Sequence, residues 1–329
     1  MVNIIQVKME YRYFGFDGHY GGDLYEKVLC EKILTDFPEL NFTRKTVKRK
    51  GGIKSVIGLI KLLFIGQTFN GRIIRPFGTP IFRKNMTVIL HHYDQSGSPY
   101  YTKILEYIDK FCLKLLSRIL SIKFITVSKH WSDWVDINFK KKSYIIYNDL
   151  EVNIDLKRDK KYLSEKYKFD LEKRWVFLGG NQKKKGGALL IKNLQETPSM
   201  SLQNIQIIQT GSGRSEENNF SVIRWIECVD YLSFISCCDI VIANSQFSEG
   251  WCRILHEAAL LDIPIAGSGR GGMGELLELT NSKSSYTTEE LCQLIIKEGD
   301  YFKANKTKLN ELKEISNDNL NLWIKEITS

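Results

Sequence analysis

The sequence predicts an α/β protein built from two doubly wound domains. Short apolar runs rich in β-branched residues alternate with helical patterns along both halves of the chain, an order that is typical of parallel sheets covered by helices on both faces. The length of 329 residues and a hydrophobic content of 43% allow a large buried core, and domains usually run to about 100 to 200 residues. We therefore expect two domains that face each other across a cleft.

The elements follow one another in a regular order. We expect strands at residues 3–7, 87–92, 123–128 and 143–148 in the first half, and at 174–180, 204–213, 239–244 and 263–268 in the second. Helices are expected at residues 22–36, 99–121, 128–138, 185–193, 229–236 and 251–261. A polar stretch at residues 148–174 separates the two halves. Ligands of such sheets bind beyond the carboxyl ends of the strands, which places a ligand in the cleft between the domains.

Positive charge is concentrated in the first half of the chain. The formal net charge is +9, yet residues 1–150 hold 24 Lys and Arg against 13 Asp and Glu, while residues 151–329 hold 23 against 25. Such asymmetry indicates a nucleic acid, an anionic membrane surface or a phosphorylated ligand as partner, or else an uneven solubilising surface. A nucleic acid is disfavoured, because the basic residues are not interleaved with the stacking aromatic residues of an RNA-binding motif.

The cysteines and the N-terminus indicate a cytoplasmic protein. Seven cysteines form no C-x-x-C pair and no metal-ligand spacing, which favours reduced thiols. The N-terminus lacks the pattern of a secretory signal, and the longest apolar runs fall short of the about 20 residues that a membrane helix needs. Residues 43–66 join a cluster of cations to an apolar, helix-spaced segment. This pattern suits either contact with an anionic membrane surface or a helix packed on the sheet.

Two glutamates stand in a stretch that otherwise predicts a buried helix. Glu249 and Glu257 are eight positions apart, so on one helix their carboxylates would lie about 12 Å apart, too far to act together on one atom as an acid/base pair. They would instead hold two ends of an elongated ligand, with the helix N-terminus suited to a diphosphate between them. The alternative is a capping role for the first glutamate.

Glycine-rich turns follow three strands of the second half. These turns lie at residues 178–187, 211–214 and 267–276, and their backbone N–H groups can approach an anion closely. The first turn also carries Lys183, Lys184 and Lys185 directly before a helix, where an ammonium group would neutralise a phosphate. For Lys183 and Lys184 a solvated surface run is the favoured alternative.

Residues 174–280 closely resemble the nucleotide-binding half of the family 4 glycosyltransferases, which have the GT-B fold. The resemblance rests on Ser245, Glu249, Gly250, Glu257 and Ala258, followed by Pro264 in a strand and by a Gly-Gly-x-x-Glu turn at Gly271, Gly272 and Glu275. The first half is similar more loosely. The resemblance implies two facing Rossmann-like domains, with residues 1–155 binding the acceptor, residues 156–310 binding a nucleotide sugar, and a helical tail at residues 311–329.

The resemblance also implies roles for the matched residues. Glu257 would bind the ribose hydroxyls of a nucleotide, Glu249 the hydroxyls of its sugar, and Lys185 the diphosphate. The donor is expected to meet the backbone of Gly211, Gly250, Trp251, Gly271 and Gly272. Gly21 and Gly22 would border both donor and acceptor. Adjacent residues of a strand point to opposite faces, so only one of His91 and His92 would face the cleft, and we take His92 as the candidate. A core histidine with satisfied hydrogen bonds is the alternative for either.

As a whole, the resemblance implies transfer of a sugar from a UDP- or GDP-sugar to a hydroxyl of a glycan or lipid-linked acceptor, with retention of configuration. The expected setting is assembly of bacterial cell-surface polysaccharide or glycolipid, in the cytoplasm or at the inner face of the plasma membrane. We expect no metal and no cofactor, because Lys185 and helix N-termini would stabilise the leaving diphosphate, and Asp133 and Asp136 lack the D-x-D spacing.

One position departs from the family pattern. Gly180 stands where the family usually has an arginine, so that one phosphate-binding cation is missing. Lys183, Lys184 or Arg214 are the candidates to replace it. The alternative function is therefore a non-catalytic, nucleotide-sugar-binding partner subunit of the same fold.

Overall fold

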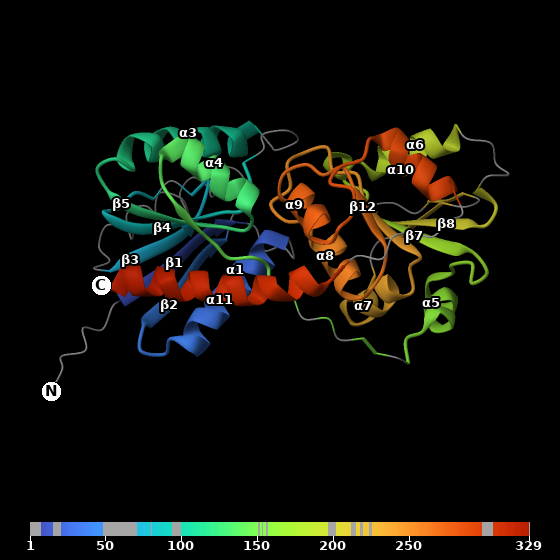
Figure 1. The fold of residues 1–329 in the computed structure, drawn as a ribbon, viewed down its shortest axis with the longest axis horizontal. Helices are drawn as coiled ribbons and strands as arrows, with labels where there is room; N and C mark the ends of the chain where they lie inside the picture. The colour runs from blue at the N-terminus through green and yellow to red at the C-terminus, as the bar shows by residue number, and fades with distance from the viewer. Residues whose placement is uncertain are drawn as a thin grey trace. The chain divides into compact units, whose positions relative to one another are not determined.

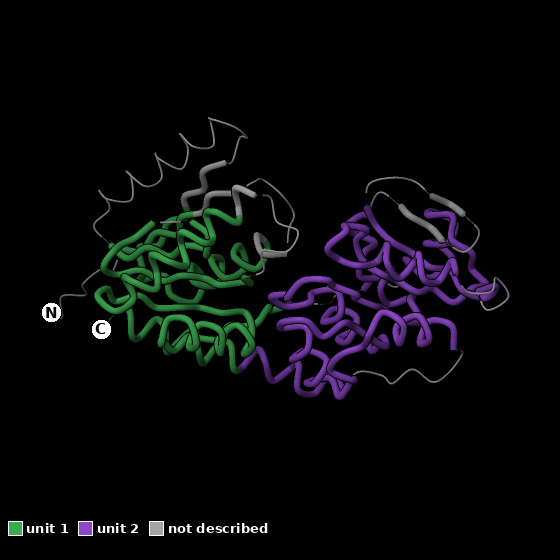
Figure 2. Tube along the Cα trace, turned by 90° about the horizontal axis from the view of Figure 1, so that it is seen from above, with its two compact units in different colours: residues 1–149, 315–329 green, residues 150–314 purple. Residues whose placement is uncertain are grey.

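The structure is a computed structural model that describes residues 8–328 apart from 16–20, 49–70, 80, 94–99, 151, 153, 156, 197–201, 212–214, 218–219, 224–225 and 298–304. The chain divides into two compact units (Figure 2): unit 1 comprises residues 1–149 with 315–329, and unit 2 comprises residues 150–314. Each unit contains one sheet with helices on both faces (Figure 1), so the α/β class and the two doubly wound domains are confirmed.

Unit 1 is built around a parallel sheet with the strand order β2-β1-β3-β4-β5-β6. Figure 1 shows α3 and α4 on one face of this sheet and α1 and α11 on the other. The elements before the C-terminal helix are β1 (Lys8–Gly15), α1 (Gly21–Asp36), β2 (Asn41–Lys48), β3 (Arg72–Pro76), β4 (Asn85–Leu90), α3 (Tyr100–Leu116), β5 (Ser121–Thr126), α4 (Lys129–Phe139) and β6 (Ser143–Ile145).

The C-terminal helix α11 (Thr307–Thr328) completes unit 1 instead of forming a separate tail. Trp323 is fully buried, and its Nε1–H donates a hydrogen bond to Thr87 Oγ1 at 3.1 Å. The backbone N–H of Tyr147 donates to Ser316 Oγ at 2.9 Å. These contacts explain why residues 315–329 belong to the first unit, whereas we had expected residues 311–329 to stand apart and the first domain to end at residue 155. The two units divide between Asp149 and Leu150.

Unit 2 is built around a second sheet with the strand order β12-β11-β7-β8-β10-β9. Its strands are parallel except that β9 is antiparallel to β10. The elements are α5 (Lys160–Tyr167), β7 (Arg174–Gly180), the 3-10 turn η1 (Lys183–Lys185), α6 (Gly187–Gln195), β8 (Ile205–Thr210), β9 (Ser215–Glu217), β10 (Phe220–Ile223), α7 (Cys228–Ser236), β11 (Ile240–Ala243), α8 (Arg253–Leu260), β12 (Ile265–Gly267), α9 (Gly272–Leu279) and α10 (Thr288–Ile296).

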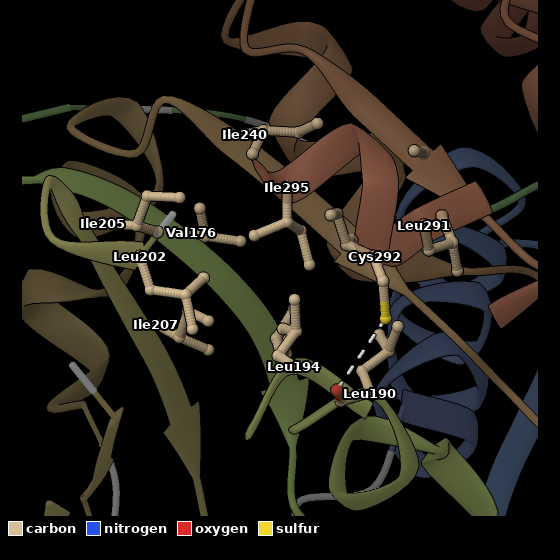
Figure 3. Packing of buried hydrophobic residues seen from close by; sticks show 13 residues of the cluster. Val176, Leu190, Leu194, Leu202, Ile205, Ile207, Ile240, Leu291, Cys292 and Ile295 are labelled. Atoms are coloured by element: carbon tan, nitrogen blue, oxygen red, sulfur yellow. Dashed lines mark hydrogen bonds between the residues drawn. The ribbon is translucent and has the colours of Figure 1, made fainter. Parts of the chain in front are cut away.

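A continuous apolar cluster joins α6 and α10 to the second sheet (Figure 3). Leu190 and Leu194 of α6 pack together with Leu291 and Ile295 of α10, and all four side chains are fully buried. The strands contribute Val176, Ile205, Ile207 and Ile240. The clustering follows from the sequence, because these strands read as nearly continuous apolar runs and such runs are buried on both faces of a parallel sheet.

The strand order of unit 2 reverses between β7 and β11. From β7 the chain moves outward to β8 on one side, and it later returns to place β11 and β12 on the other side of β7. At such a switch point the loops after the two central strands leave toward opposite faces, which opens a crevice at their carboxyl ends. A ligand site is therefore expected at the loops that follow β7 and β11.

The strands predicted in the second half match the structure closely, but β2 and β3 of the first half and β9 and β10 of the second half were not predicted. β7 has the predicted bounds, and β11 and β12 differ from prediction by no more than two residues at either end. The predicted strand at residues 3–7 lies outside the described residues, as does most of the basic segment at residues 43–66. β2 and β3 were missed because their arginines and lysines interrupt the apolar pattern. No helix among the described residues is long and apolar enough to cross a membrane.

A buried ion pair fixes α3 on the first sheet. Arg75 of β3 and Asp109 of α3 are both fully buried, and they form two hydrogen bonds of 2.8 Å, Nη1 to Oδ2 and Nη2 to Oδ1. Arg75 Nε also donates to the carbonyl oxygen of Ile81 at 2.9 Å, and the backbone N–H of Gly78 donates to Asp109 at 2.8 Å. Because both charges have hydrogen-bond partners, the pair is stable as a unit but costly to break from one side.

Replacing Asp109 with Asn should destabilise unit 1 strongly. The change leaves the guanidinium of Arg75 buried without its counter-charge, which typically costs about 3–5 kcal/mol. The measurement is urea unfolding followed by tryptophan fluorescence, since Trp131 and Trp323 are buried in this unit.

Two further variants test the explanation. The double variant Arg75→Met/Asp109→Leu should recover most of the lost stability, because no charge is then left buried. Asp133→Asn removes the exposed Lys129–Asp133 pair on α4 and should change the free energy of unfolding by less than about 1 kcal/mol. Equal losses for Asp109→Asn and Asp133→Asn would contradict the prediction.

Candidate functional site

The loops after β7 and β11 are tied together at the switch point. The backbone N–H of Gln246 donates to the carbonyl oxygen of Lys184 at 2.8 Å, and Asn244 Nδ2 donates to the carbonyl oxygen of Gly186 at 3.1 Å. Two segments about 60 positions apart in the chain thus form one surface at the strand ends.

Gly186 allows this close approach. Its φ is +67°, and a Cβ atom at this position would lie 2.0 Å from the carbonyl oxygen of Asn244. A side chain is excluded by the contact as well as by the backbone angle. The glycine that ends the lysine turn is therefore needed for the two loops to meet.

An ion pair between Lys185 and Glu249 spans the two loops. Lys185 Nζ lies 2.7 Å from Glu249 Oε1, and the hydroxyl of Ser245 donates to the same oxygen. Glu249 is 8% exposed at its side chain, whereas Lys185 is 36% exposed. Burial by itself would lower the pKa of Lys185, but the neighbouring Glu249 carboxylate outweighs it and holds the pKa above its ordinary value. Lys185 therefore stays protonated at neutral pH.

Glu249 lies in an extended segment and is not part of a helix. Its backbone pairs with Gly271 in an isolated parallel bridge: its N–H donates to the carbonyl oxygen of Arg270 at 3.1 Å, and its carbonyl oxygen accepts from the N–H of Gly272 at 2.9 Å. Helix α8 begins only at Arg253. The expectation that both glutamates share one helix was therefore wrong, because the bridge to the 270–272 turn uses the backbone groups that a helix would need.

The bridge explains the first glycine of the Gly-Gly turn. Gly271 has φ +69°, and a Cβ atom there would lie 2.4 Å from the carbonyl oxygen of Glu249. Gly272, the second glycine, is the first residue of α9. The structure thus brings Gly271 and Gly272 into direct backbone contact with Glu249.

Glu257 is held inside unit 2 by a cation and a hydroxyl. It lies on α8 and is 2% exposed. Arg253 Nε, one turn earlier, lies 2.5 Å from Glu257 Oε1, and the hydroxyl of Tyr231 on α7 donates to Oε2 at 3.0 Å. Burial raises the pKa of Glu257, although Arg253 and Tyr231 oppose that rise. Arg253 and Tyr231 were not predicted as site residues; the i, i+4 spacing of Arg253 and Glu257 is the one signal that the sequence carried.

Trp251 is anchored by His256, which was not predicted as a site residue. Its Nε1–H donates to His256 Nδ1 at 3.0 Å, and the two rings meet edge to face with centroids 5.7 Å apart. Both residues are buried. Burial lowers the pKa of His256 to about 4, which agrees with a neutral ring that accepts at Nδ1. The pair holds the segment between Glu249 and α8 in place.

The remaining second-half candidates lie at neighbouring strand ends. Gly211 follows β8, and a Cβ atom there would lie 1.7 Å from Asn181 Oδ1 in the loop after β7. Gly180 pairs with Thr210 at the end of β7. Gly250 is buried next to Glu249. Arg214, a candidate to replace the missing cation, lies outside the described residues.

The candidates in unit 1 lie where its own strands end. Gly21 and Gly22 open helix α1, and His91 and His92 follow β4 directly. His91 Nε2 lies 2.8 Å from Glu26 Oε1 on α1, and its ring meets that of Tyr25 edge to face. His91 is thus bound to α1, while His92 is half-buried beside it.

A polar pocket of about 420 Å³ lies beside the Glu249 loop. Gln246 and Arg270 line it, together with residues at the start of α10, but Lys185, Glu249 and Glu257 do not. Three of its charged side chains already have partners, since Lys283 pairs with Glu290 and Arg270 donates to the carbonyl oxygen of Gln246 at 3.0 Å. We therefore place the candidate site at the Lys185–Glu249 pair. Among the described residues no cluster of His, Cys, Asp and Glu could hold a metal ion.

The Glu257→Gln variant should become more stable relative to the wild type as the pH rises. Because the pKa of Glu257 is raised in the folded state, its contribution to stability is present below the pKa of the unfolded chain and is lost as the pH rises through the folded value. A glutamine cannot ionise and avoids that loss. Thermal unfolding of both proteins between about pH 4 and pH 7 measures the difference.

The matched control is Glu278→Gln on the neighbouring helix α9, where the side chain is exposed. Its melting temperature should follow that of the wild type at each pH. A Glu257→Gln variant whose stability relative to the wild type does not change with pH would contradict the burial argument.

The sequence matches no protein-family model and no curated protein, whereas the fold matches solved glycosyltransferase structures over nearly the whole chain. HepE of Anabaena in complex with UDP-glucose superposes with a TM-score of 0.66 at 14% identity, covering 96% of this chain and 99% of that one. WaaG, a glycosyltransferase involved in lipopolysaccharide biosynthesis, gives a TM-score of 0.67 at 10% identity, covering 96% and 94%.

Sucrose-phosphate synthase of Thermosynechococcus elongatus gives a TM-score of 0.59 at 11% identity, covering 98% of this chain and 96% of that one. These neighbours are GT-B glycosyltransferases. Two Rossmann-like units, each with a parallel sheet and a reversal of strand order, are the shared architecture. The chain has the GT-B fold.

Proposed function

We propose that this protein is a glycosyltransferase that moves a sugar from a nucleotide diphosphate sugar to an acceptor hydroxyl. The observation that carries the proposal is the Lys185–Glu249 ion pair at the strand ends of the switch point, with Glu257 on the adjacent helix α8. Structural neighbours that bind UDP or UDP-glucose support a nucleotide-sugar donor. A UDP- or GDP-sugar is the proposed donor.

Lys185 is the proposed diphosphate-binding group. In the structure its ammonium group contacts the Glu249 carboxylate at 2.7 Å and remains partly exposed. A donor diphosphate would compete for this ammonium group, and the charge that develops on the leaving nucleotide would then be stabilised by a preformed cation. In the proposed reaction Lys185 stabilises the leaving nucleotide without a metal ion or a cofactor.

Glu249 and Glu257 are the proposed hydroxyl-binding groups. A carboxylate accepts up to about four hydrogen bonds, so each glutamate can keep its protein partners and still accept from a sugar hydroxyl. Ser245 orients Glu249 toward the loop after β7, and Tyr231 with Arg253 orients Glu257. We propose that Glu249 binds the sugar and Glu257 the ribose, with the backbone of Gly250 and Trp251 between them.

The acceptor is proposed to be a glycan or a lipid-linked sugar of the bacterial cell surface, with retention of configuration at the transferred carbon. The proposed setting is the cytoplasm or the inner face of the plasma membrane, where nucleotide sugars and lipid-linked acceptors meet. In unit 1 we propose His92 as a catalytic residue, and Gly21 and Gly22 as residues that border both donor and acceptor.

A non-catalytic nucleotide-sugar-binding subunit is the second candidate. Gly180 favours it, since this position at the end of β7 has no side chain with which to bind a phosphate. Binding of a nucleotide sugar without any turnover, even with the natural acceptor, would favour this second function.

Replacing Lys185 with Met should lower kcat/KM for donor turnover by at least about a hundredfold, as the loss of a preformed electrostatic contact to a developing charge does. Glu249→Ala should lower it similarly. The assay is hydrolysis of each nucleotide sugar in a panel, after screening the panel for thermal stabilisation, since a ligand at a hundredfold excess over its Kd stabilises by about 2.7 kcal/mol.

Lys183→Met is the matched control, because Lys183 belongs to the same turn and is exposed. It should retain near wild-type turnover. Turnover that is unaffected by Lys185→Met, or equally reduced by Lys183→Met, would refute the proposed role of the ion pair.

A further inference from the structure

Helix α3 of unit 1 has an orientation that its buried residues determine. Asp109 is held by Arg75 on the sheet side, and Leu113, one turn later on the same side, is also fully buried. Residues three and four positions apart lie on the same side of a helix. The opposite side of α3 must therefore point away from the sheet.

That opposite side is apolar and exposed. Its side chains, with their exposed fractions, are Ile104 at 41%, Tyr107 at 64%, Ile108 at 43%, Phe111 at 57% and Leu115 at 55%, continued by Ile119 at 80% in the turn after the helix. Intervals of three and four residues place them in one continuous stripe. A surface helix normally exposes its polar residues, and a contiguous apolar patch marks an interaction surface.

A row of cations borders the apolar stripe. Lys103, Lys110, Lys114 and Arg118 repeat at intervals of seven and four residues, so they follow one edge of the stripe. Lys114 and Arg118 are exposed, and Lys110 Nζ lies over the rings of Tyr93 and Trp134 at 4.8 and 4.9 Å from their centroids. The carboxylate of Asp109 is buried on the other side of the helix.

This combination favours a lipid surface as the partner. An apolar stripe with a basic edge and an aromatic residue matches the acyl boundary and the anionic headgroups of a membrane. A second copy of the chain is disfavoured, because an antiparallel two-fold contact through the same stripe would bring two basic edges together. The excess of Lys and Arg over Asp and Glu in residues 1–150 also favours an anionic surface as the partner.

We propose that the exposed face of α3 lies in the plane of an anionic membrane surface, with its apolar stripe at the acyl boundary and its basic edge against the headgroups. This surface lies outside the donor site, which is in unit 2, and the proposal does not depend on catalysis. It is also distinct from the basic segment at residues 43–66.

The experiment is co-sedimentation of the full chain with vesicles of phosphatidylcholine, with and without phosphatidylglycerol. Wild type should sediment only with the anionic vesicles and less at high salt. Phe111→Glu/Leu115→Glu should weaken vesicle binding by about tenfold or more, since the membrane would no longer bury these two apolar side chains. Lys114→Glu/Arg118→Glu should weaken binding to anionic vesicles and remove its salt dependence.

Ile137→Glu is the matched control, because Ile137 is 70% exposed on the neighbouring helix α4; this variant should bind vesicles like the wild type. Donor hydrolysis without acceptor should be unchanged in all these variants, which separates this proposal from the proposed function. Wild type that does not sediment, or α3 variants that sediment like the wild type, would overturn the proposal. A wild-type dimer that Phe111→Glu/Leu115→Glu converts to a monomer, without vesicle binding, would assign the face to a second copy instead.

Discussion

The contact between Lys185 and Glu249 is the interaction on which the candidate site depends. It joins the loops after β7 and β11, the two strands between which the strand order of unit 2 reverses. The helices that follow these strands leave in opposite directions, so the loops alone can close the crevice at the strand ends. Gly186 and Gly271 serve the same contact, because each removes a side chain where two backbone segments must touch.

Both glutamates of the site share one electrostatic arrangement. Each buried carboxylate is paired with a cation and with a hydroxyl: Lys185 and Ser245 for Glu249, Arg253 and Tyr231 for Glu257. A buried carboxylate without such partners would gain a proton or destabilise the fold. The pairing keeps a carboxylate available as a hydrogen-bond acceptor in a place that water hardly reaches, which is what recognition of a hydroxylated ligand requires.

Unit 1 uses a buried ion pair for a different purpose. Arg75 and Asp109 are fully enclosed and joined by two hydrogen bonds, so a ligand cannot reach them, and their effect is to set the rotation of α3. The pair in unit 2 is partly exposed at Lys185 and can exchange partners. Exposure therefore separates an ion pair that orients a helix from one that can bind an anion.

The sequence by itself determined the α/β class, the strands β7, β11 and β12 to within two residues, and the positions of Glu249, Glu257 and the Gly-Gly turn. These features are local, because an apolar run, a glycine at a strand end and a motif spacing are visible in consecutive residues. The tertiary structure alone decided that Glu249 lies in a bridge to Gly271, that Tyr231, Arg253 and His256 hold the site residues, and that residues 315–329 complete unit 1. The physical reason is that these contacts join elements brought together by strand order, and periodicity within one element reports which face is buried but not which element buries it.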